Sequence, residues 1–360
     1  MSKFIQLHLL TSYPPANLNR DDLGRPKTAM MGGANRLRIS SQSLKRAWRT
    51  SEIFQQALTG HVGTRTKEMG VKIYRAILEK GVSEKKAMDW AKAIAGVFGK
   101  LKTFSKKEKE HAEDGNSLIE LEIEQLAHFS PEEEQNIFAL IDDLAASGQA
   151  PTDEQLALLR KKHTASDIAL FGRMLASNPS YNTEAAAQVA HAISVHKVTV
   201  EDDFFTAVDD LNKGEEDMGA GHMGETEFAA GLFYLYLCID KELLTENLSG
   251  DVDLANQTLS ALIQSAATIA PSGKQNSFAS RARASYILCE TGDQQPRSLS
   301  VAFLKPIGGS DLLPQSIEAL EQTRQNMDAV YGDSSERTAT LNALSGEGSL
   351  QAIIDCATGA

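Results

Sequence analysis

A short segment near the start of the chain combines hydroxyl, amide and cationic side chains at helical spacing. If residues 41–49 form a helix, four polar or basic side chains gather within an arc of about 100°: Gln42, Lys45, Arg46 and Arg49. Leu44, Ala47 and Trp48 then occupy the opposite side. Such a helix either binds a polyanion along its basic face or exposes that face to water.

The first turn of this helix favours the binding alternative. Ser40 or Ser41 is a suitable N-cap, and the unpaired backbone amides of a first helical turn can receive phosphate oxygens. The loop just upstream, residues 14–35, is rich in turn-forming and basic residues and adds cations beside the helix. We therefore predict a polyanion-binding surface at this point of the chain.

Charge is distributed unevenly along the sequence. The whole chain has a formal net charge of -12, which taken alone argues against nucleic acid because phosphate affinity depends on clustered lysine and arginine. Residues 1–50, however, hold nine lysines and arginines against two aspartates, a net charge of +7, so the other 310 residues carry -19. This asymmetry predicts one basic binding surface on an acidic body.

An acidic pair, Asp21 and Asp22, follows Arg20 in the same basic loop. The two carboxylates could hold a divalent metal for phosphodiester cleavage, or they could form local ion pairs and turn hydrogen bonds. The sequence lacks a Walker-type phosphate loop, an HExxH motif and paired CxxC motifs, and a helix would set His191 and His196 on different faces. We predict no metal, no cofactor and no catalytic residue.

Two aromatic residues, Phe204 and Phe205, lie between acidic runs at 201–203 and 209–210. Burying a segment with so many carboxylates would be costly. An exposed ring can stack on a base, which is worth about 1–3 kcal/mol per base, or it can pack on its own hairpin. The sequence leaves both alternatives open.

The first half of the chain positions the basic helix between a strand and a helical region. Residues 4–10 alternate in character, with Gln6 and His8 on one side, which is typical of a strand with one polar face. A short strand at 36–40 leads into the basic helix. Residues 51–163, including TDEQLALLRKKH (152–163), have a largely helical pattern, and 185–194 continue it.

The second half returns to strand patterns. Residues 196–230 are expected to form a protruding hairpin, and 233–239 a strand buried on both faces. We further expect helices near 253–270 and 315–331 and strands near 285–290 and 298–304. Because strands and helices mix without a regular βα period, the sequence predicts an α+β fold with an antiparallel sheet.

Composition bounds the environment of the protein. No apolar segment approaches the roughly 20 residues that cross a bilayer, and the N-terminal segment is unlike a signal peptide. Cys238, Cys289 and Cys356 have the spacing of neither a zinc site nor a disulfide framework. We expect reduced thiols, a cytoplasmic protein and no contact with a membrane.

Longer motifs add a resemblance to a known family. The segment NLNRDDLGRPKTAMMGGANRLRISSQSLKRAWR (17–49) is the most specific of them. Further matches, in order, are ALFGRMLAS (169–177), AHAISVHKV (190–198), FTAVDDL (205–211), HMGETEFAAGLFY (222–234) and PSGKQ (271–275). These motifs resemble the CasC family, the backbone subunit of the type I-E CRISPR Cascade complex.

The resemblance implies a shape like a right hand. It implies an RNA-recognition-like (ferredoxin-like) antiparallel palm at 1–51, 166–195 and 231–360. A helical fingers insertion would span 52–165 and a β-hairpin thumb 196–230. The first strand has Gln6 and His8 in place of stacking aromatics, so contacts to the RNA backbone should dominate over stacking on the sheet.

The resemblance also implies contact residues. Ser40, Gln42, Lys45 and Arg49 would contact the backbone of a guide RNA (crRNA), as the basic stripe already suggests. Met174, Phe205 and Thr206 would flank the point where a neighbouring thumb flips out a nucleotide, and Lys27 would face DNA. The complete predicted RNA-binding set is Arg20, Lys27, Arg38, Ser40, Gln42, Lys45, Arg46, Arg49, Met174, Phe205, Thr206 and Lys274.

The implied partners are crRNA, target DNA, other Cascade subunits and copies of the chain itself in a head-to-tail filament. A non-enzymatic binder of this kind leaves the base edges of the guide free for pairing. Two rival functions stay open. One is a metal-dependent guide-complex ribonuclease with Asp21 or Asp22 as a ligand, and the other is a generic single-strand binder.

Overall fold

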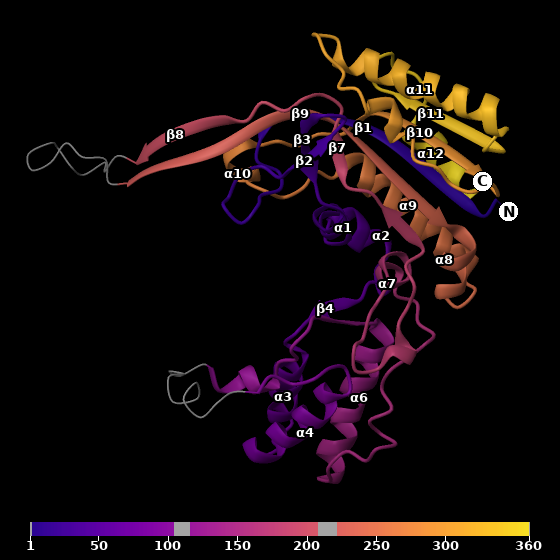
Figure 1. The fold of residues 1–360 in the computed structure, drawn as a ribbon. Coiled ribbons are helices and arrows are strands. Elements are labelled where there is room, and N and C mark those ends of the chain that lie inside the picture. Colours follow the sequence, from indigo (N-terminus) through magenta and orange to yellow (C-terminus); the bar gives the residue numbers. More distant parts are fainter. Residues whose placement is uncertain (1, 104–115, 208–221, 360) are drawn as a thin grey trace, which may run out of the picture. The chain divides into compact units, whose positions relative to one another are not determined.

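The computed structural model describes residues 2–103, 116–207 and 222–359, and contacts divide the chain into two units (Figure 1). The first unit comprises Met1–Ala57, Gln188–Lys241 and Leu259–Ala360, and the second Leu58–Ala187 and Glu242–Thr258. Residues 208–221, in the predicted thumb, lie outside the described residues. Residues 166–187, which the resemblance assigned to the palm, fall in the second unit. The division into palm, fingers and thumb stays a prediction.

A large antiparallel sheet organises the first unit. Its strand order is β11 (Arg337–Asn342), β10 (Ala284–Gly292), β1 (Phe4–Ala16), β9 (His222–Asp240), β7 (Ala192–Ser194), β3 (Ala34–Ile39) and β2 (Thr28–Met31). Two more strands, β6 (Ala187–Val189) and β8 (Glu201–Ala207), pair with β9. The prediction of an α+β protein with an antiparallel sheet is confirmed.

Strand β1 lies in the middle of this sheet, with Leu7 opposite Leu237 on β9 and Cys289 on β10. Gln6 and His8 lie on one face of the strand, as predicted, but both are buried. Polar residues here face a helix rather than water. The β1–β9 register shifts between Tyr13 and Ala16, since the intervening prolines lack the N–H that a ladder needs.

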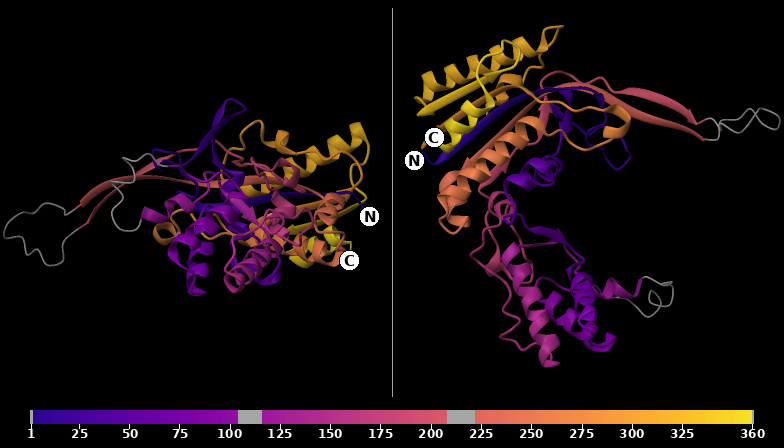
Figure 2. Two further views of the ribbon diagram at one scale, coloured as in Figure 1. Left: turned by 90° about the horizontal axis from the view of Figure 1, so that it is seen from below. Right: turned by 180° about the vertical axis from the view of Figure 1, so that it is seen from behind.

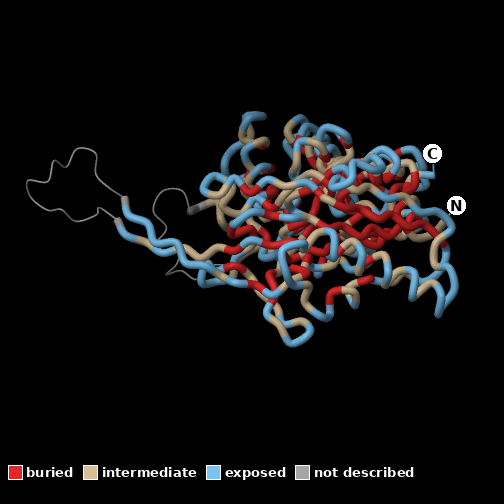
Figure 3. The backbone as a smooth tube through the Cα atoms, turned by 90° about the horizontal axis from the view of Figure 1, so that it is seen from above, coloured by how far each residue is buried: buried red, intermediate tan, exposed pale blue. Residues whose placement is uncertain are grey.

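Helices cover both faces of the sheet. Figure 1 shows α11 (Leu312–Tyr331) on one side and α9 (Val252–Thr268) and α12 (Leu350–Thr358) on the other. The core under α11 includes Leu10, Tyr234 and Leu288, together with Phe303 from the 3-10 helix η3 (Ser300–Phe303). Figure 3 shows the central strands as a buried band. A base therefore has no open face of these strands on which to stack.

A buried polar network fastens α11 to the sheet. His8 on β1 contacts Glu290 on β10 through Nε2 (3.2 Å) and the Tyr234 hydroxyl through Nδ1 (2.8 Å). Arg297 donates to both carboxylate oxygens of Glu290 (2.7 and 3.0 Å) and to Asp328 on α11 (3.3 Å). One arginine thereby joins a central strand to the helix that covers it.

The partners of Glu290 keep it ionised despite its burial. Burial alone would raise the pKa of this carboxyl, but hydrogen bonds from His8 and Arg297 and the positive charge of Arg297 lower the pKa to about 2. Burial lowers the pKa of His8, which favours the neutral imidazole with its proton on Nε2, donated to Glu290. The ion pair therefore stabilises the folded chain at neutral pH.

Helices dominate the second unit. Its core is formed by α3 (Met69–Glu79), α4 (Glu84–Gly96) and α6 (Pro131–Ser147), beside the short strands β4 (Thr64–Thr66) and β5 (Ala127–Phe129). The second unit also contains η1 (Asn116–Leu121), α7 (Ser166–Phe171), η2 (Pro179–Tyr181) and most of α8 (Lys241–Asn247). No helix among the described residues is long and apolar enough to cross a bilayer.

Helix α6 begins with a capping motif. Ser130 and Glu133 form a capping box, and Pro131 occupies the first turn. Glu133 has a second role, because its buried carboxylate also pairs with Arg173 at 2.6 Å. The helix ends at Gly148, whose φ of 66° is the left-handed conformation that glycine adopts readily.

Two helix predictions are wrong because tertiary contacts determine the backbone. Residues 152–163 are irregular, and the Arg160 amide donates to Glu133 (2.8 Å) while its carbonyl accepts from Arg173 (2.9 Å). Residues 185–194 were expected to be helical but contain β6 and β7, which pair with longer strands. Strand formation depends on such neighbours more than on local propensity.

The predicted strand at 298–304 is also wrong. Its two buried residues, Leu299 and Phe303, are four apart, while Val301 and Leu304 are exposed, which is the spacing of a helical turn. The last strand of the sheet is β11, which the sequence analysis missed because its side chains are mostly exposed at the sheet edge. The predicted helices near 253–270 and 315–331 are confirmed as α9 and α11.

We predict that Glu290→Gln lowers the free energy of unfolding by about 3 kcal/mol at pH 7, because a neutral amide loses the buried ion pair with Arg297. The difference from the wild type should narrow below about pH 4.5. There the unfolded chain takes up a proton that the folded carboxylate, with a pKa of about 2, resists. Chemical denaturation at several pH values measures both effects.

The control for this prediction is Asp142→Asn, which breaks an exposed ion pair with Lys80. Such pairs contribute little, so the change should stay below about 1 kcal/mol. A stability difference for Glu290→Gln that stays constant from pH 7 to pH 3 would contradict the role of the ionised carboxylate.

Candidate nucleic-acid interface

The basic helix predicted from the sequence is α1 (Ser41–Arg49). It begins at Ser40, whose hydroxyl accepts a hydrogen bond from the Ser43 amide at 3.4 Å. Leu44 and Trp48 are buried, Trp48 with 0% exposure. The opposite side carries the predicted contact residues, with Gln42 and Arg46 exposed and Lys45 and Arg49 half-buried. The helix and its two faces are confirmed.

The cations of α1 divide between two flanks. Arg46 lines a hollow of about 610 Å³ together with Ser43, Thr50 and the distant Arg281. At 100° per residue, Lys45 and Arg49 are both rotated from Arg46 in the same direction about the helix axis, so they lie toward the other flank of the helix. Arg281 was absent from the predicted set, since nothing local in the sequence links it to α1.

Partial burial affects Lys45 directly. It lowers the pKa of the ammonium group, since a charge removed from water is less stable. An anion that approaches this group meets a weaker solvent screen than it would at a fully exposed lysine. The positive charges of Arg46 and Arg49 in the last turn also interact favourably with the negative end of the helix dipole.

Two asparagines fix the loop that precedes the helix, residues 17–27, which we call the asparagine loop. Asn17 donates from its amide to the carbonyls of Gly24 and Glu227, both at 2.9 Å. Asn19 accepts from the Ser40 backbone amide at 2.9 Å, so the loop and the helix cap are held together. The NLNRDD motif contained both residues, but sequence reasoning assigned a role to neither.

Asp21, the first residue of the acidic pair, stabilises a turn of this loop. One oxygen of Asp21 accepts from the amides of Leu23 and Arg25, both at 2.9 Å, and the other from Arg25 Nε at 3.3 Å. The Arg25 amide, followed by that of Leu23, holds the pKa of Asp21 below its usual value. Asp22 and Arg20 are exposed. Within the described residues no group of three possible metal ligands occurs.

One cation of the basic segment is unavailable to a ligand. Arg36 has 0% exposure, and its guanidinium donates to the carbonyls of Ser194 (2.9 Å), Phe303 (2.9 Å) and Leu304 (3.4 Å). It therefore caps the end of η3, where carbonyls lack helical partners. The net charge of residues 1–50 therefore includes one cation, Arg36, that does not contribute to the basic surface.

The PSGKQ loop lies against the asparagine loop. A Cβ on Gly273 would collide with the carbonyl of Leu18, so only glycine fits at this approach. Lys274 follows with a φ of 48°, just before the short helix α10 (Gln275–Phe278), and its ammonium donates to Thr226 at 2.9 Å. The predicted contact residue Lys274 is thus held at the base of the β8–β9 pair.

Strands β8 and β9 extend from the sheet as a two-stranded ribbon (Figure 2). Phe205 pairs with Gly224, and its ring covers the space that a side chain would occupy there. Phe205 is nevertheless 41% exposed. Neighbouring strand residues alternate, so Phe204, 64% exposed, lies on the other face with Thr206 and Met223. Both alternatives for Phe205 thus hold in part: it packs on its own ribbon and still offers ring surface.

Lys274 lies on the Phe205 face of the ribbon. Its partner Thr226 is two residues from Gly224 on β9, and residues two apart in a strand share a face. Phe228, two residues further, approaches Phe278 of α10 at 5.9 Å between ring centroids. The structure therefore brings Phe205 and Lys274 to one side and sets Thr206 on the opposite side.

Met174 belongs to the second unit, where it is 75% exposed beside a small hollow of about 260 Å³. Its predicted position across a nucleotide from Phe205 stays a prediction.

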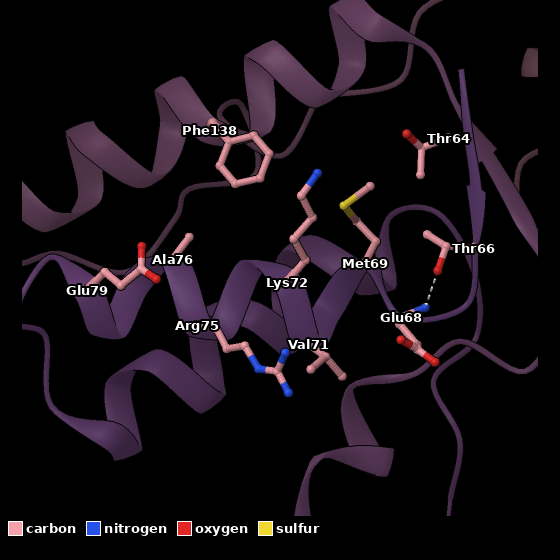
Figure 4. A pocket seen from close by; sticks show the side chains of 10 residues that line it. All are labelled: Thr64, Thr66, Glu68, Met69, Val71, Lys72, Arg75, Ala76, Glu79 and Phe138. Atoms are coloured by element: carbon pink, nitrogen blue, oxygen red, sulfur yellow. Dashed lines mark hydrogen bonds between the residues drawn. The ribbon is translucent and has the colours of Figure 1, made fainter. Parts of the chain in front are cut away.

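The helical unit has a further hollow of about 450 Å³ (Figure 4). Met69, Lys72, Arg75 and Phe138 are among its lining residues. The ammonium of Lys72 is already paired with Glu134 at 2.8 Å and lies 5.0 Å from the Phe138 ring. Lys72 of this hollow is therefore engaged with neighbouring side chains.

Comparison with known proteins agrees with the motifs. A family model described as CT1975-like protein matches residues 5–355. A chain in a solved structure described as "CRISPR RNA-guided surveillance complex, pre-nicking" is 30% identical, with a TM-score of 0.84 over 99% of each chain. The chain belongs to the CT1975-like family. This membership confirms the resemblance to the CasC family.

A second solved chain shares the fold of this CT1975-like protein at lower identity. It is described as "CRISPR RNA-guided surveillance complex" and is 23% identical, with a TM-score of 0.74 over 99% of each chain. No curated protein matches the sequence. The fold is therefore shared along the whole length of both solved chains, including the helical unit where the motifs were sparse.

We predict that the α1 stripe binds phosphate without reading sequence. Replacing Lys45 and Arg49 with alanine should weaken RNAs of different sequence equally and flatten the salt dependence of log K by about 1.4, or 0.7 per lost contact with a single strand. Filter binding or fluorescence anisotropy over a salt series measures both quantities.

The matched control replaces Arg75 and Lys85, two exposed cations of the helical unit, with alanine. It removes the same charge, and its slope should stay within about 0.5 of the wild type. An unchanged slope for the α1 variant, with the fold intact by circular dichroism, would remove this helix from the interface.

Proposed function

We propose that this chain is a non-catalytic crRNA-binding backbone subunit that assembles head to tail along the guide of a type I-E Cascade complex. In this role it presents the guide for pairing with target DNA in antiviral defence. The observation that carries the proposal is the 30% identity, over 99% of both chains, with a chain of a CRISPR RNA-guided surveillance complex. The basic face of α1 supports it independently.

The proposed mode of binding is through the guide backbone. The groups around α1 are hydroxyls, amides and cations, which suit phosphate oxygens. Base edges would then stay free to pair, as a guide requires. The sheet would be an elaborated RNA-recognition-like palm whose usual stacking face is closed by α11, so RNA would run along the edge at α1.

The ribbon would be the thumb that reaches the guide held by a neighbouring copy. Phe205 would stack beside a kinked nucleotide there, with Thr206 and the neighbour's Met174 close by. Support comes from the ring surface that Phe205 exposes far from the core of the sheet. A head-to-tail arrangement needs two different surfaces on each copy, and the ribbon and the α1 edge are different surfaces.

The other proposed partners follow from the same role. Lys27, in the asparagine loop, would face target DNA, and further Cascade subunits would cover the ends of the filament. The protein would work in the cytoplasm without contact to a membrane. We propose no metal or cofactor, because the oxygens of Asp21 are used within its own turn.

The first test is the nucleic acid that copurifies with the protein expressed beside its partner subunits and a CRISPR array. We predict discrete RNAs of one length, because the filament should protect a complete guide. Denaturing gel electrophoresis and sequencing of the bound RNA measure this. Heterogeneous RNA would favour the generic binder, and Mn²⁺-dependent cleavage of a complementary RNA that Asp22→Ala abolishes would favour the ribonuclease.

The second test separates the two phenylalanines of the ribbon. Phe205→Ala should leave the monomer folded but remove stacking worth about 1–3 kcal/mol at each junction, so the RNA-bound assembly shortens or loosens. The periodic chemical reactivity of flipped nucleotides should disappear. Analytical ultracentrifugation and base-reactivity probing of the bound guide measure these effects.

Phe204→Ala is the matched control, since it removes the same ring from the opposite face of the ribbon. It should preserve periodic reactivity. If Phe205→Ala unfolds the monomer, or if periodic reactivity survives it, Phe205 is a structural residue rather than a wedge.

A further inference from the structure

A histidine outside the predicted RNA-binding set contacts one of its members. His191 Nδ1 lies 2.9 Å from Nη1 of Arg38. A guanidinium can only donate, so Nδ1 must accept this hydrogen bond. The imidazole is therefore neutral and carries its proton on Nε2, which is left as a second donor.

The strand register places His191 beside the start of α1. Arg38 pairs with Ile193 and Ile39 with Ala192 across β3 and β7. His191 precedes Ala192, and Ser40, the N-cap of α1, follows Ile39, so both residues lie at the same end of this ladder. Lys27 joins the same place, because its carbonyl accepts from the Arg38 amide at 2.8 Å. Segments distant in the sequence thus meet at one edge of the sheet.

The charges in this cluster are all of one sign. Burial lowers the pKa of His191, and the nearby positive charges of Arg38 and Lys27 lower it further. Within residues 2–103, 116–207 and 222–359, neither Arg38 nor Lys27 has a carboxylate at ion-pairing distance. Arg173, by contrast, pairs with Glu133, and Arg297 pairs with Glu290 and Asp328. Like charges without a counter-ion repel, and a bound anion would relieve the repulsion.

We propose that His191 and Arg38 form a site for one phosphodiester group of the guide, next to the N-terminus of α1 and beside Lys27, with His191 as a neutral N–H donor. This inference rests on the proposed function and adds a contact residue to it. His191 also holds the guanidinium of Arg38 in place through Nδ1. The site presents N–H donors and cations only, which excludes a metal ion and suits an oxyanion.

The test is a double-mutant cycle on RNA binding over a salt series. Arg38→Ala should weaken binding about tenfold and flatten the salt dependence by about 0.7, since one cation leaves a phosphate. His191→Ala should weaken binding about threefold to tenfold, with less than half that change in slope, because the group it removes is neutral. The double variant should lose less than the product of the single losses, since both side chains serve one phosphate.

Two further variants separate binding from folding. His191→Gln can accept from Arg38 through its oxygen and donate through its nitrogen, so it should bind within about threefold of the wild type. His191→Phe keeps the ring but neither nitrogen, so it should bind as weakly as His191→Ala. Thermal denaturation should give all variants the same midpoint within a few degrees.

Three outcomes would overturn the inference. They are wild-type binding by folded His191→Ala, wild-type binding by folded His191→Phe, or independent effects of Arg38 and His191 in the cycle. If Lys45→Ala with Arg49→Ala still weakens binding in those cases, only this inference fails. If none of these variants changes RNA affinity, the proposed function fails as well.

Discussion

The ion pair between Glu290 and Arg297 holds helix α11 over one face of the sheet. It is buried under α11 and extends to Asp328 on that helix, so it joins the helix to a central strand. Breaking such a pair leaves an unpaired buried charge, which makes the arrangement hard to open. With α9 and α12 on the other side, both faces of the sheet are closed. The proposed polyanion surface lies instead at the edge of the sheet, around α1 and its preceding loop.

Hydrogen bonds from neutral side chains to the backbone, together with one close approach of two backbone segments, assemble that edge. Asn17 and Asn19 satisfy backbone groups of the ribbon and of the α1 cap, and Gly273 allows the PSGKQ loop to approach Leu18. These contacts carry no charge, yet they decide which cations stand near one another. The basic residues themselves are mostly half-buried or exposed and could be exchanged with less effect on the fold. Neutral polar residues thus hold the surface, and the cations are the groups proposed to bind phosphate.

Local features of this site could be predicted from the sequence, but contacts between residues far apart in the sequence could not. The α1 stripe follows from helical periodicity alone, and the burial of Trp48 with it. Arg36 could not be separated from its basic neighbours, because its carbonyl partners lie on β7 and η3, far away in the sequence. Arg281 and His191 were missed for the same reason. Likewise β6 and β7 depend on pairing with longer strands, which a local pattern does not report.

The ribbon shows how charge selects between two similar side chains. Its strands carry the carboxylates of residues 201–203, 225 and 227, which would repel a nearby RNA backbone. Lys274 offsets this repulsion at Thr226, on the face that Phe205 shares with Glu201 and Asp203. The Phe204 face carries Asp202, Glu225 and Glu227 and has no such cation among these contacts. Phe204 is more exposed and would be the better candidate by area alone. Because stacking on a base also brings a phosphate close, we expect the cation to outweigh the extra surface, and for this reason Phe205 is the proposed wedge.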